Sequence, residues 1–366
     1  MQMNTIYYCS RCRMPYPNTG FPYKCPNCGG FFEISEIKNL QLGKQNNNLA
    51  GIWKYRSTFG LNETAPMTYL GEGNTPLVDR VVNGCKVYYK LESLNPTGSF
   101  KDRGTAVLIS MLKARGISEA IEDSSGNAGA SFAAYSSAFD LKASIYIPDS
   151  TSGPKREQIE TYGANVIPIP GPRENAAKAV LEVIETQNKT YASHAYQPFG
   201  LAGMATIAYE LVEQMQPEPK NILVPVGHGS LMLGLMLGFE ALYQARLIFQ
   251  RPRFIGVQPA AYAPLVSLCK HQTYSPSNTP TVAEGTKINM PIRGDAILAR
   301  LTEKDMFLAV SEAEIIEAYH QLSHMGLFVE PTSALVQAGF SKLAGQLDHP
   351  TVLILTGFGL KSDIRI

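Results

Sequence analysis

The stretch NPTGSFKDRG, residues 95–104, places Lys101 directly after a Pro-Thr-Gly-Ser turn and at the expected start of a helix. Most lysines are solvated charges on the protein surface. A reactive lysine differs from these because it needs a fixed position and a way to lose its proton. The stretch therefore raises the hypothesis of a positioned, reactive lysine, which the rest of the chain has to support.

Length and charge indicate the general class of protein. A chain of 366 residues is long enough for two domains and a small appendage. Hydrophobic residues make up 45% and charged residues 17%, which favours large buried cores over disorder. The net charge is +1, so neither a nucleic acid nor a membrane surface is an expected partner. Because no secretory signal is apparent, we expect a cytoplasmic protein that acts on a small molecule.

Four of the six cysteines form two CxxC pairs, Cys9 with Cys12 and Cys25 with Cys28. Two tight turns can bring four thiolates onto a tetrahedral Zn²⁺. Two disulfides are the alternative, which the absence of a secretory signal disfavours. A redox CxxC is also possible but usually occurs singly beside a βαβ unit. We therefore predict a structural zinc ribbon, since four thiolates leave no open coordination position for catalysis.

From about residue 85 onward, short β-branched or aromatic runs alternate with helical patterns, which predicts an α/β fold with open, mostly parallel sheets. The expected strands are 86–91, 119–123, 142–148, 164–169, 221–226, 253–258, 307–310 and 351–356. The expected helices are 100–115, 128–138, 155–162, 174–187, 203–215, 231–245, 312–324 and 332–344. The predicted domains are a zinc ribbon over 1–38, a linker and lead-in over 39–70, and two larger domains over 71–200 and 201–366.

Four unusual loops follow expected strands, where ligands bind in folds of this kind. They are the lysine stretch, SSGNAGAS (124–131), GHGS (227–230) and TGFG (356–359). Each alone has an ordinary explanation, because glycine-rich turns are common and SSGNAGAS can be only a helix cap. The glycines around GHGS run GxGxxxxG, which does not match the dinucleotide pattern GxGxxG.

Together these loops resemble the pyridoxal-phosphate enzymes of fold type II, and among them the threonine synthases. The segments FVEPTSA (328–334), LTGFGLK (355–361), GEGNTPL (71–77) and YGANV (162–166) and the cysteine ribbon extend the resemblance over nearly the whole chain. It implies a tryptophan synthase β-like fold with pyridoxal 5'-phosphate in the cleft between two domains. It also implies an amino-acid substrate and a homodimer.

The resemblance implies a role for individual residues. Lys101 would hold the cofactor as a Schiff base and then move protons at the substrate's carbon atoms. The implied cofactor-binding residues are Lys101, Phe100, Asn127 at the ring hydroxyl, Gly227, His228, Gly229 and Ser230 at the phosphate, and Thr356 at the pyridine nitrogen. The implied ligands of the substrate carboxylate are Ser124, Ser125 and Ala128. A hydroxyl at the ring nitrogen implies a milder electron sink than a carboxylate would, which suits elimination or replacement at Cβ or Cγ.

One segment departs from the threonine synthase pattern NPFRxEGxKT. It reads QPFGLAGMAT (197–206), so that Gly200, Ala202 and Ala205 stand in place of Arg, Glu and Lys. Each lost charge-assisted hydrogen bond to a substrate phosphate is worth about 1.5–3 kcal/mol. We expect threonine synthase chemistry, with elimination from serine or threonine, or β-replacement on an activated serine, as the alternative. A catalytically inactive binding relative and a nucleotide-binding dehydrogenase are rivals from other classes. His194, shortly before this segment, is expected to be structural.

Overall fold

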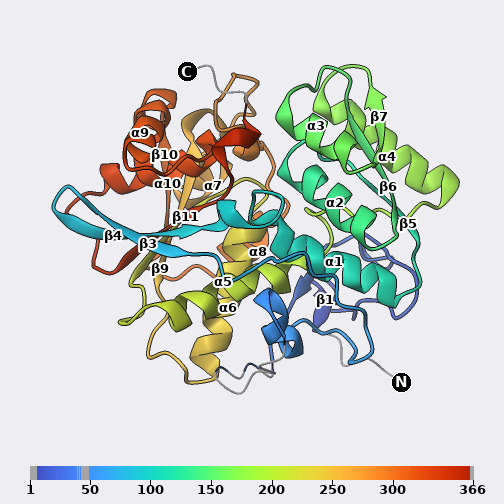
Figure 1. Cartoon of the computed structure of the whole chain (residues 1–366), viewed down its shortest axis with the longest axis horizontal. Coiled ribbons are helices and arrows are strands. Elements are labelled where there is room, and N and C mark those ends of the chain that lie inside the picture. Colours follow the sequence, from blue (N-terminus) through green and yellow to red (C-terminus); the bar gives the residue numbers. More distant parts are fainter. Residues whose placement is uncertain (1–5, 39, 41, 43–48, 363–366) are drawn as a thin grey trace. The chain divides into compact units, whose positions relative to one another are not determined.

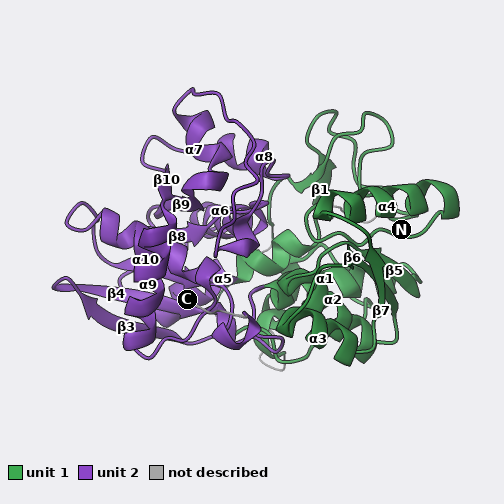
Figure 2. Cartoon of the chain, turned by 90° about the horizontal axis from the view of Figure 1, so that it is seen from above, with its two compact units in different colours: residues 1–73, 101–206 green, residues 74–100, 207–366 purple. Residues whose placement is uncertain are grey.

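The computed structural model describes residues 6–38, 40, 42 and 49–362 (Figure 1). The linker predicted over 39–70 includes residues 39, 41 and 43–48, which lie outside the described residues. The chain divides into two compact units (Figure 2): unit 1 comprises residues 1–73 and 101–206, and unit 2 comprises residues 74–100 and 207–366. In the described part of the chain, every helix falls short of the length and apolarity needed to cross a membrane.

Unit 1 contains a parallel three-stranded sheet in the order β5-β6-β7. Its strands are β5 (Glu119–Glu122), β6 (Lys142–Pro148) and β7 (Asn165–Ile169). The accompanying helices are α1 (Lys101–Ala114), α2 (Asn127–Ala138), α3 (Pro154–Thr161), α4 (Arg173–Gln187) and the first half of α5 (Gly200–Gln214). The carboxyl end of β5 therefore leads into the N-terminus of α2, which is where ligands bind in open α/β sheets.

The N-terminal cysteine module belongs to unit 1. Its two short strands, β1 (Tyr7–Cys9) and β2 (Phe32–Ile34), are antiparallel. Aromatic rings anchor the module on Phe199, since the rings of Tyr7 and Tyr16 each lie 4.8 Å from that ring in edge-on contacts. Arg115, directly after α1, completes the contact, with its guanidinium 4.9 Å from the Tyr16 ring. The module is thus packed against the body of unit 1.

Unit 2 is built on a six-stranded sheet in the order β10-β9-β8-β11-β4-β3. Its strands are β3 (Leu77–Val82), β4 (Cys85–Leu91), β8 (Asn221–Pro225), β9 (Arg253–Pro259), β10 (Met306–Val310) and β11 (Thr351–Leu355). All neighbours are parallel except β3 and β4. The continuous apolar runs of β8 and β11 are buried along their whole length, as expected for central strands covered on both faces.

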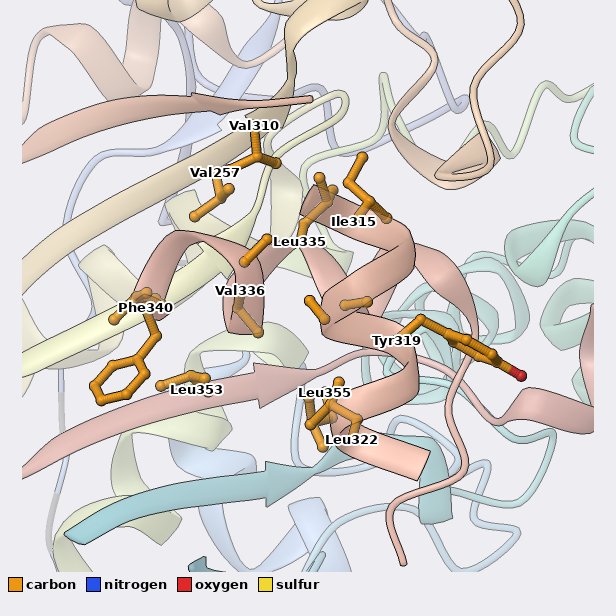
Figure 3. Packing of buried hydrophobic residues seen from close by; sticks show 14 of the residues in the cluster. Val257, Val310, Ile315, Tyr319, Leu322, Leu335, Val336, Phe340, Leu353 and Leu355 are labelled. Atoms are coloured by element: carbon orange, nitrogen blue, oxygen red, sulfur yellow. The ribbon is translucent and has the colours of Figure 1, made fainter. Parts of the chain in front are cut away.

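Helices supply the apolar layers of unit 2. They are the second half of α5, then α6 (Ser230–Gln244), α7 (Pro264–Cys269), α8 (Gly294–Leu298), α9 (Glu312–His324) and α10 (Pro331–Lys342). Figure 3 shows side chains of α9 and α10 packed with Val257 of β9, Val310 of β10 and Leu353 of β11, all of them fully buried. Among the described residues, 3-10 helices form at Gly51–Thr58, Glu92–Leu94, Ala260–Tyr262, Glu284–Thr286 and Gly359–Lys361.

The α/β alternation predicted from the sequence is confirmed, and the expected strands and helices are present with end shifts of a few residues. Strand β3 was not expected. It forms a hairpin with β4 through Asn83 and Gly84, whose φ angles are 52° and 76°. Both angles suit a two-residue hairpin turn. Because β4 pairs with β11, residues 74–100 pack in unit 2, whereas the sequence predicts a domain over 71–200 that includes them.

Candidate active site

The turn before Lys101 is fixed by hydrogen bonds within unit 2. The Gly98 N–H donates to the Asn95 carbonyl at 2.8 Å, and Gly98 has a φ of 83° that favours glycine. The Phe100 N–H then donates to the Thr356 carbonyl at 3.0 Å, directly after β11. Lys101 follows Phe100 in the chain and is the first residue of α1. These hydrogen bonds therefore fix Phe100, the residue before the lysine, at the end of the buried strand β11.

The two charged residues after Lys101 are buried within unit 1. The Ser131 hydroxyl of α2 donates to Asp102 Oδ1 at 2.6 Å, and the Arg103 guanidinium donates to Thr206 Oγ1 at 2.9 Å. Both side chains are fully buried, whereas Lys101 itself is half-buried. Asp102 and Arg103 therefore tie the first turn of α1 to its neighbours and leave Lys101 partly accessible.

The SSGNAG loop connects the carboxyl end of β5 to the N-terminus of α2. The Ser124 side chain is buried and its hydroxyl accepts a hydrogen bond from the Gly126 N–H at 3.3 Å. Any side chain at Gly129 would collide with the Ser124 carbonyl, so glycine is required there. Ser125 and Asn127 are half-buried. A helix N-terminus presents N–H groups that lack partners in the helix, which suits an anionic ligand.

Two acidic residues at the end of β5, which were not expected from the sequence, lie beside this loop. The Glu122 carboxylate is 1% exposed and lies 2.8 Å from His194 Nδ1, while the His194 N–H donates to its second oxygen at 3.0 Å. Burial raises the pKa of Glu122 to about 7 and lowers the pKa of His194 well below its usual range. Asp123 accepts a hydrogen bond from the Tyr191 hydroxyl at 2.8 Å. No local sequence pattern connects residues so far apart.

In unit 2, the GHGS loop connects β8 to α6. Gly229 has a φ of 93°, and a side chain there would come within 3.3 Å of Arg293 Cβ. A side chain at Gly227 would come within 2.9 Å of the Gly285 carbonyl. Because a side chain at either glycine would crowd its neighbours, only backbone atoms line the loop at these two positions. Ser230 begins the 15-residue helix α6, whose dipole favours an anion at this end.

Thr356, at the end of β11, belongs to a buried chain of hydroxyl groups and one carboxylate. The Ser333 hydroxyl accepts the N–H groups of Thr356 and Gly357 at 2.9 and 3.1 Å and lies 3.0 Å from Thr356 Oγ1. Thr356 Oγ1 in turn donates to Glu330 Oε1 at 3.3 Å. Of these residues, only Thr356 had a role expected from the sequence. The segment FVEPTSA contained the missing signal, because it places Glu330 and Ser333 at the start of α10.

Within each unit the predicted site residues lie at one edge of the sheet or at adjoining helix ends. In unit 1, Lys101 begins α1 and Asn127 begins α2, and these two helices pack together through Asp102 and Ser131. In unit 2, β8 and β11 are parallel neighbours, so the GHGS loop and Thr356 lie beyond the same edge. The roles assigned to these residues remain predictions.

The four ribbon cysteines converge as the spacing predicts. Their sulfur atoms all lie within 4.8 Å of one another, with 3.4 Å between those of Cys9 and Cys28 and 3.6 Å between those of Cys12 and Cys25. Gly30 lies against Cys9, and a side chain there would come within 2.9 Å of that sulfur. Hydrogen bonds lower the pKa of Cys12 to about 6, and the bond with the Met14 backbone has the largest effect. The lower pKa favours the thiolate, which is the form that binds metal. The cluster has the donors of a four-thiolate site.

Comparison with known proteins gives a consistent assignment. Residues 68–357 match the family described as pyridoxal-phosphate dependent enzyme. The chain is 31% identical to the threonine synthase of Methanocaldococcus jannaschii, with 96% of this chain and 92% of the relative covered. It is 34% identical to the threonine synthase of Synechocystis sp., with coverages of 84% and 82%.

Solved structures agree on the fold. A threonine deaminase from T.th. superposes with a TM-score of 0.66 at 27% identity, covering 78% of this chain and 92% of that chain. The serine racemase of Dictyostelium discoideum gives a TM-score of 0.67 at 24% identity, with coverages of 80% and 93%. The fold-type-II architecture expected from the sequence is therefore confirmed. Because the family match spans most of the chain and includes Lys101, the SSGNAG and GHGS loops and Thr356, the chain belongs to the pyridoxal-phosphate dependent enzymes.

Proposed function

We propose that this chain is a pyridoxal-phosphate dependent lyase of the threonine synthase type, which converts O-phosphohomoserine and water into threonine and phosphate. The observation that carries the proposal is the similarity to threonine synthases along nearly the whole chain. The loops themselves fit the cofactor. Gly227 and Gly229 leave a backbone-lined loop at the N-terminus of a long helix, which suits a phosphate group.

In this proposal several residues of the chain have separate roles in the reaction. Bound pyridoxal phosphate supplies a ring that withdraws electrons from the substrate's α-carbon. Lys101 Nζ holds the cofactor, then removes the α-proton and returns a proton later in the reaction. Asn127 would hydrogen-bond the ring hydroxyl, Phe100 would pack near the ring, and Thr356 would meet the ring nitrogen. An unprotonated ring nitrogen can only accept a hydrogen bond, so the Thr356 hydroxyl, which donates to Glu330 Oε1 at 3.3 Å in this structure, would turn that donor to the ring.

The anionic groups of cofactor and substrate are assigned to helix N-termini. The predicted ligands of the cofactor phosphate are Gly227, His228, Gly229 and Ser230. Ser124, Ser125 and Ala128 are the predicted ligands of the substrate carboxylate, at the start of α2. Both sites supply backbone N–H donors whose positions are set by the fold, so little reorganisation accompanies binding.

A structural Zn²⁺ on Cys9, Cys12, Cys25 and Cys28 belongs to the same proposal. With four thiolates the ion has no position for a substrate, so its role is to stabilise a module whose two strands have only three residues each. The homodimer and the cytoplasmic location expected from the sequence are carried forward as parts of this proposal.

A second candidate, elimination from serine or threonine, is favoured by the start of α5. Gly200 lies on Gly104 of α1, with a side chain at position 200 coming within 3.4 Å of the Gly104 backbone. Ala202 and Ala205 are fully buried, and α5 contains no lysine or arginine. This helix therefore offers no cation to a substrate phosphate, which a substrate without phosphate would not need.

The two candidates are separated by adding O-phosphohomoserine, O-phosphoserine, serine and threonine to the purified holoenzyme. Release of phosphate together with threonine formed from O-phosphohomoserine supports the first candidate. Release of a 2-oxo acid from serine or threonine, with O-phosphohomoserine inert, supports the second. The control variant is Lys101→Ala, which we expect to lose the near-visible absorbance of the lysine-linked cofactor. A wild-type protein without that absorbance and without activity on any of the four would contradict both candidates.

A further inference from the structure

The carboxylate of Glu122 lies in an unusual position for an acidic side chain. It ends the buried strand β5, two residues before Ser124, and is 1% exposed. His194 holds both of its oxygens, through Nδ1 at 2.8 Å and through its backbone N–H at 3.0 Å. The imidazole is itself mostly buried, with 16% of the side chain exposed. Glu122 and His194, here called the Glu–His pair, thus form a buried pair of titratable groups.

Charged groups from several elements face this pair. Lys101 at the start of α1 and Arg173 at the start of α4 act on both Glu122 and His194, and Asp123 adds a negative charge from the end of β5. The Tyr191 hydroxyl occupies one oxygen of Asp123 at 2.8 Å. The charges that act on the pair therefore include that of the lysine that begins α1.

We propose that the Glu–His pair is a positioning pair for Lys101, holding a single proton whose gain or loss changes the charge that the lysine faces. The proposal rests on the role assigned to Lys101 under the proposed function. A purely structural role explains the arrangement less well, because a buried ionisable pair is often no more stabilising than apolar side chains of the same volume. Perturbed titratable groups also concentrate at functional sites.

The direction of the effect follows from the charge of the pair. Below about pH 7 burial keeps the Glu122 carboxyl protonated, and His194 stays neutral because burial lowers its pKa well below the usual value. The pair is then uncharged. Above about pH 7 the pair carries one negative charge, which favours the protonated form of Lys101. The pair therefore opposes the loss of the lysine's proton as the pH rises.

The first experiment tests the pair without relying on catalysis. Nuclear magnetic resonance of the His194 ring nitrogens, assigned with His194→Asn, is followed from about pH 5 to 9. We expect the ring to stay neutral and its signals to report one step near pH 7 from the carboxyl of Glu122. The step should disappear in Glu122→Gln and persist in Glu119→Gln, a control on the same strand whose carboxylate pairs with Lys189 and is 42% exposed. An ordinary His194 titration near its usual pKa in the wild type would overturn the proposal, even if no variant folds.

The second experiment tests the link to the lysine. The near-visible absorbance of the holoenzyme is titrated with pH in the wild type, Glu122→Gln and Glu119→Gln. We expect its midpoint to fall by about one pH unit in Glu122→Gln, because a negative charge that stabilises the protonated form is lost, and to be unchanged in Glu119→Gln. Equal midpoints in all three proteins would overturn the proposal. Absorbance that survives Lys101→Ala would instead contradict the proposed function and leave the His194 titration as the test of the pair.

Discussion

The substitution Lys90→Met should destabilise unit 2 strongly. The Lys90 ammonium is fully buried and donates to Glu210 Oε2 at 2.7 Å, to the Thr75 carbonyl at 2.7 Å and to Gln214 Oε1 at 2.9 Å. Removal of the lysine leaves the Glu210 carboxylate buried without its cation, although the Asn74 N–H still donates to it at 2.8 Å. Breaking a buried pair in this way costs about 3–5 kcal/mol. At about 1.36 kcal/mol per factor of ten, the opening equilibrium should rise by about two powers of ten or more.

Amide hydrogen exchange in β4 and β11 is the suitable assay, because it reports on unit 2 even if the two units unfold separately. The matched control is Lys86→Met on the same strand. Its lysine pairs with Asp79 at 3.5 Å on the surface, where solvent screening leaves such pairs little effect on stability. The double variant Lys90→Met with Glu210→Gln keeps an acceptor for Asn74 and removes the stranded charge, so it should recover part of the loss. Equal exchange in the two single variants, or losses that simply add, would refute the reasoning.

Three further predictions concern the sites. Gly357→Ala should displace the Glu330 carboxylate, since a side chain at position 357 would collide with it. We therefore expect weaker binding of the cofactor in a spectral titration, and an unchanged affinity would contradict this. Chelation of Zn²⁺ should unfold the cysteine module, which circular dichroism and metal analysis would detect, and a module unchanged after complete metal loss would contradict it. In the wild type between about pH 4.5 and 6.5, the Glu–His pair binds one proton in both states, on Glu122 in the native state and on His194 in the unfolded state. The pair therefore makes no contribution to the pH dependence of the free energy of unfolding in this window. In Glu122→Gln the unfolded state alone takes up that proton, so relative to wild type the free energy of unfolding should rise with pH across this window; parallel curves would contradict it.

Much of the fold was predictable because its signals are local. Strands β8 and β11 are continuous apolar runs buried on both faces, and the glycine-rich loops after them mark the sheet edge. Strand β3 was missed because LVDRVV is only half-buried and contains two charges. The dipeptide Asn83-Gly84 was a usable hairpin signal, since its positive φ angles are those of a tight turn between antiparallel strands.

The candidate site was predictable where a residue type lies in a local motif. It was less predictable where a contact joins residues that are far apart in the sequence. Lys101 and the GHGS loop each follow or precede a recognisable element. Glu122 and His194 are 72 residues apart, and neither belongs to a motif that pointed to a site in the sequence. The expectation that His194 is structural stays a prediction, since its ring contacts the buried carboxylate of Glu122 at 2.8 Å, a contact that fits a structural role as well as a positioning one.

The segment 191–199 connects the cysteine module to the surroundings of Lys101 by a continuous series of contacts within unit 1. The Tyr16 hydroxyl of the module donates to Gln197 Oε1 at 3.3 Å, and Gln197 Nε2 donates to the Tyr191 carbonyl at 2.9 Å. The same segment supplies the partners of both acidic residues at the end of β5, through the Tyr191 hydroxyl and the His194 ring. Unfolding of the module would remove one side of this support. Metal loss should therefore alter the His194 signals as well as the module itself, which a module that merely sits on the surface would not do.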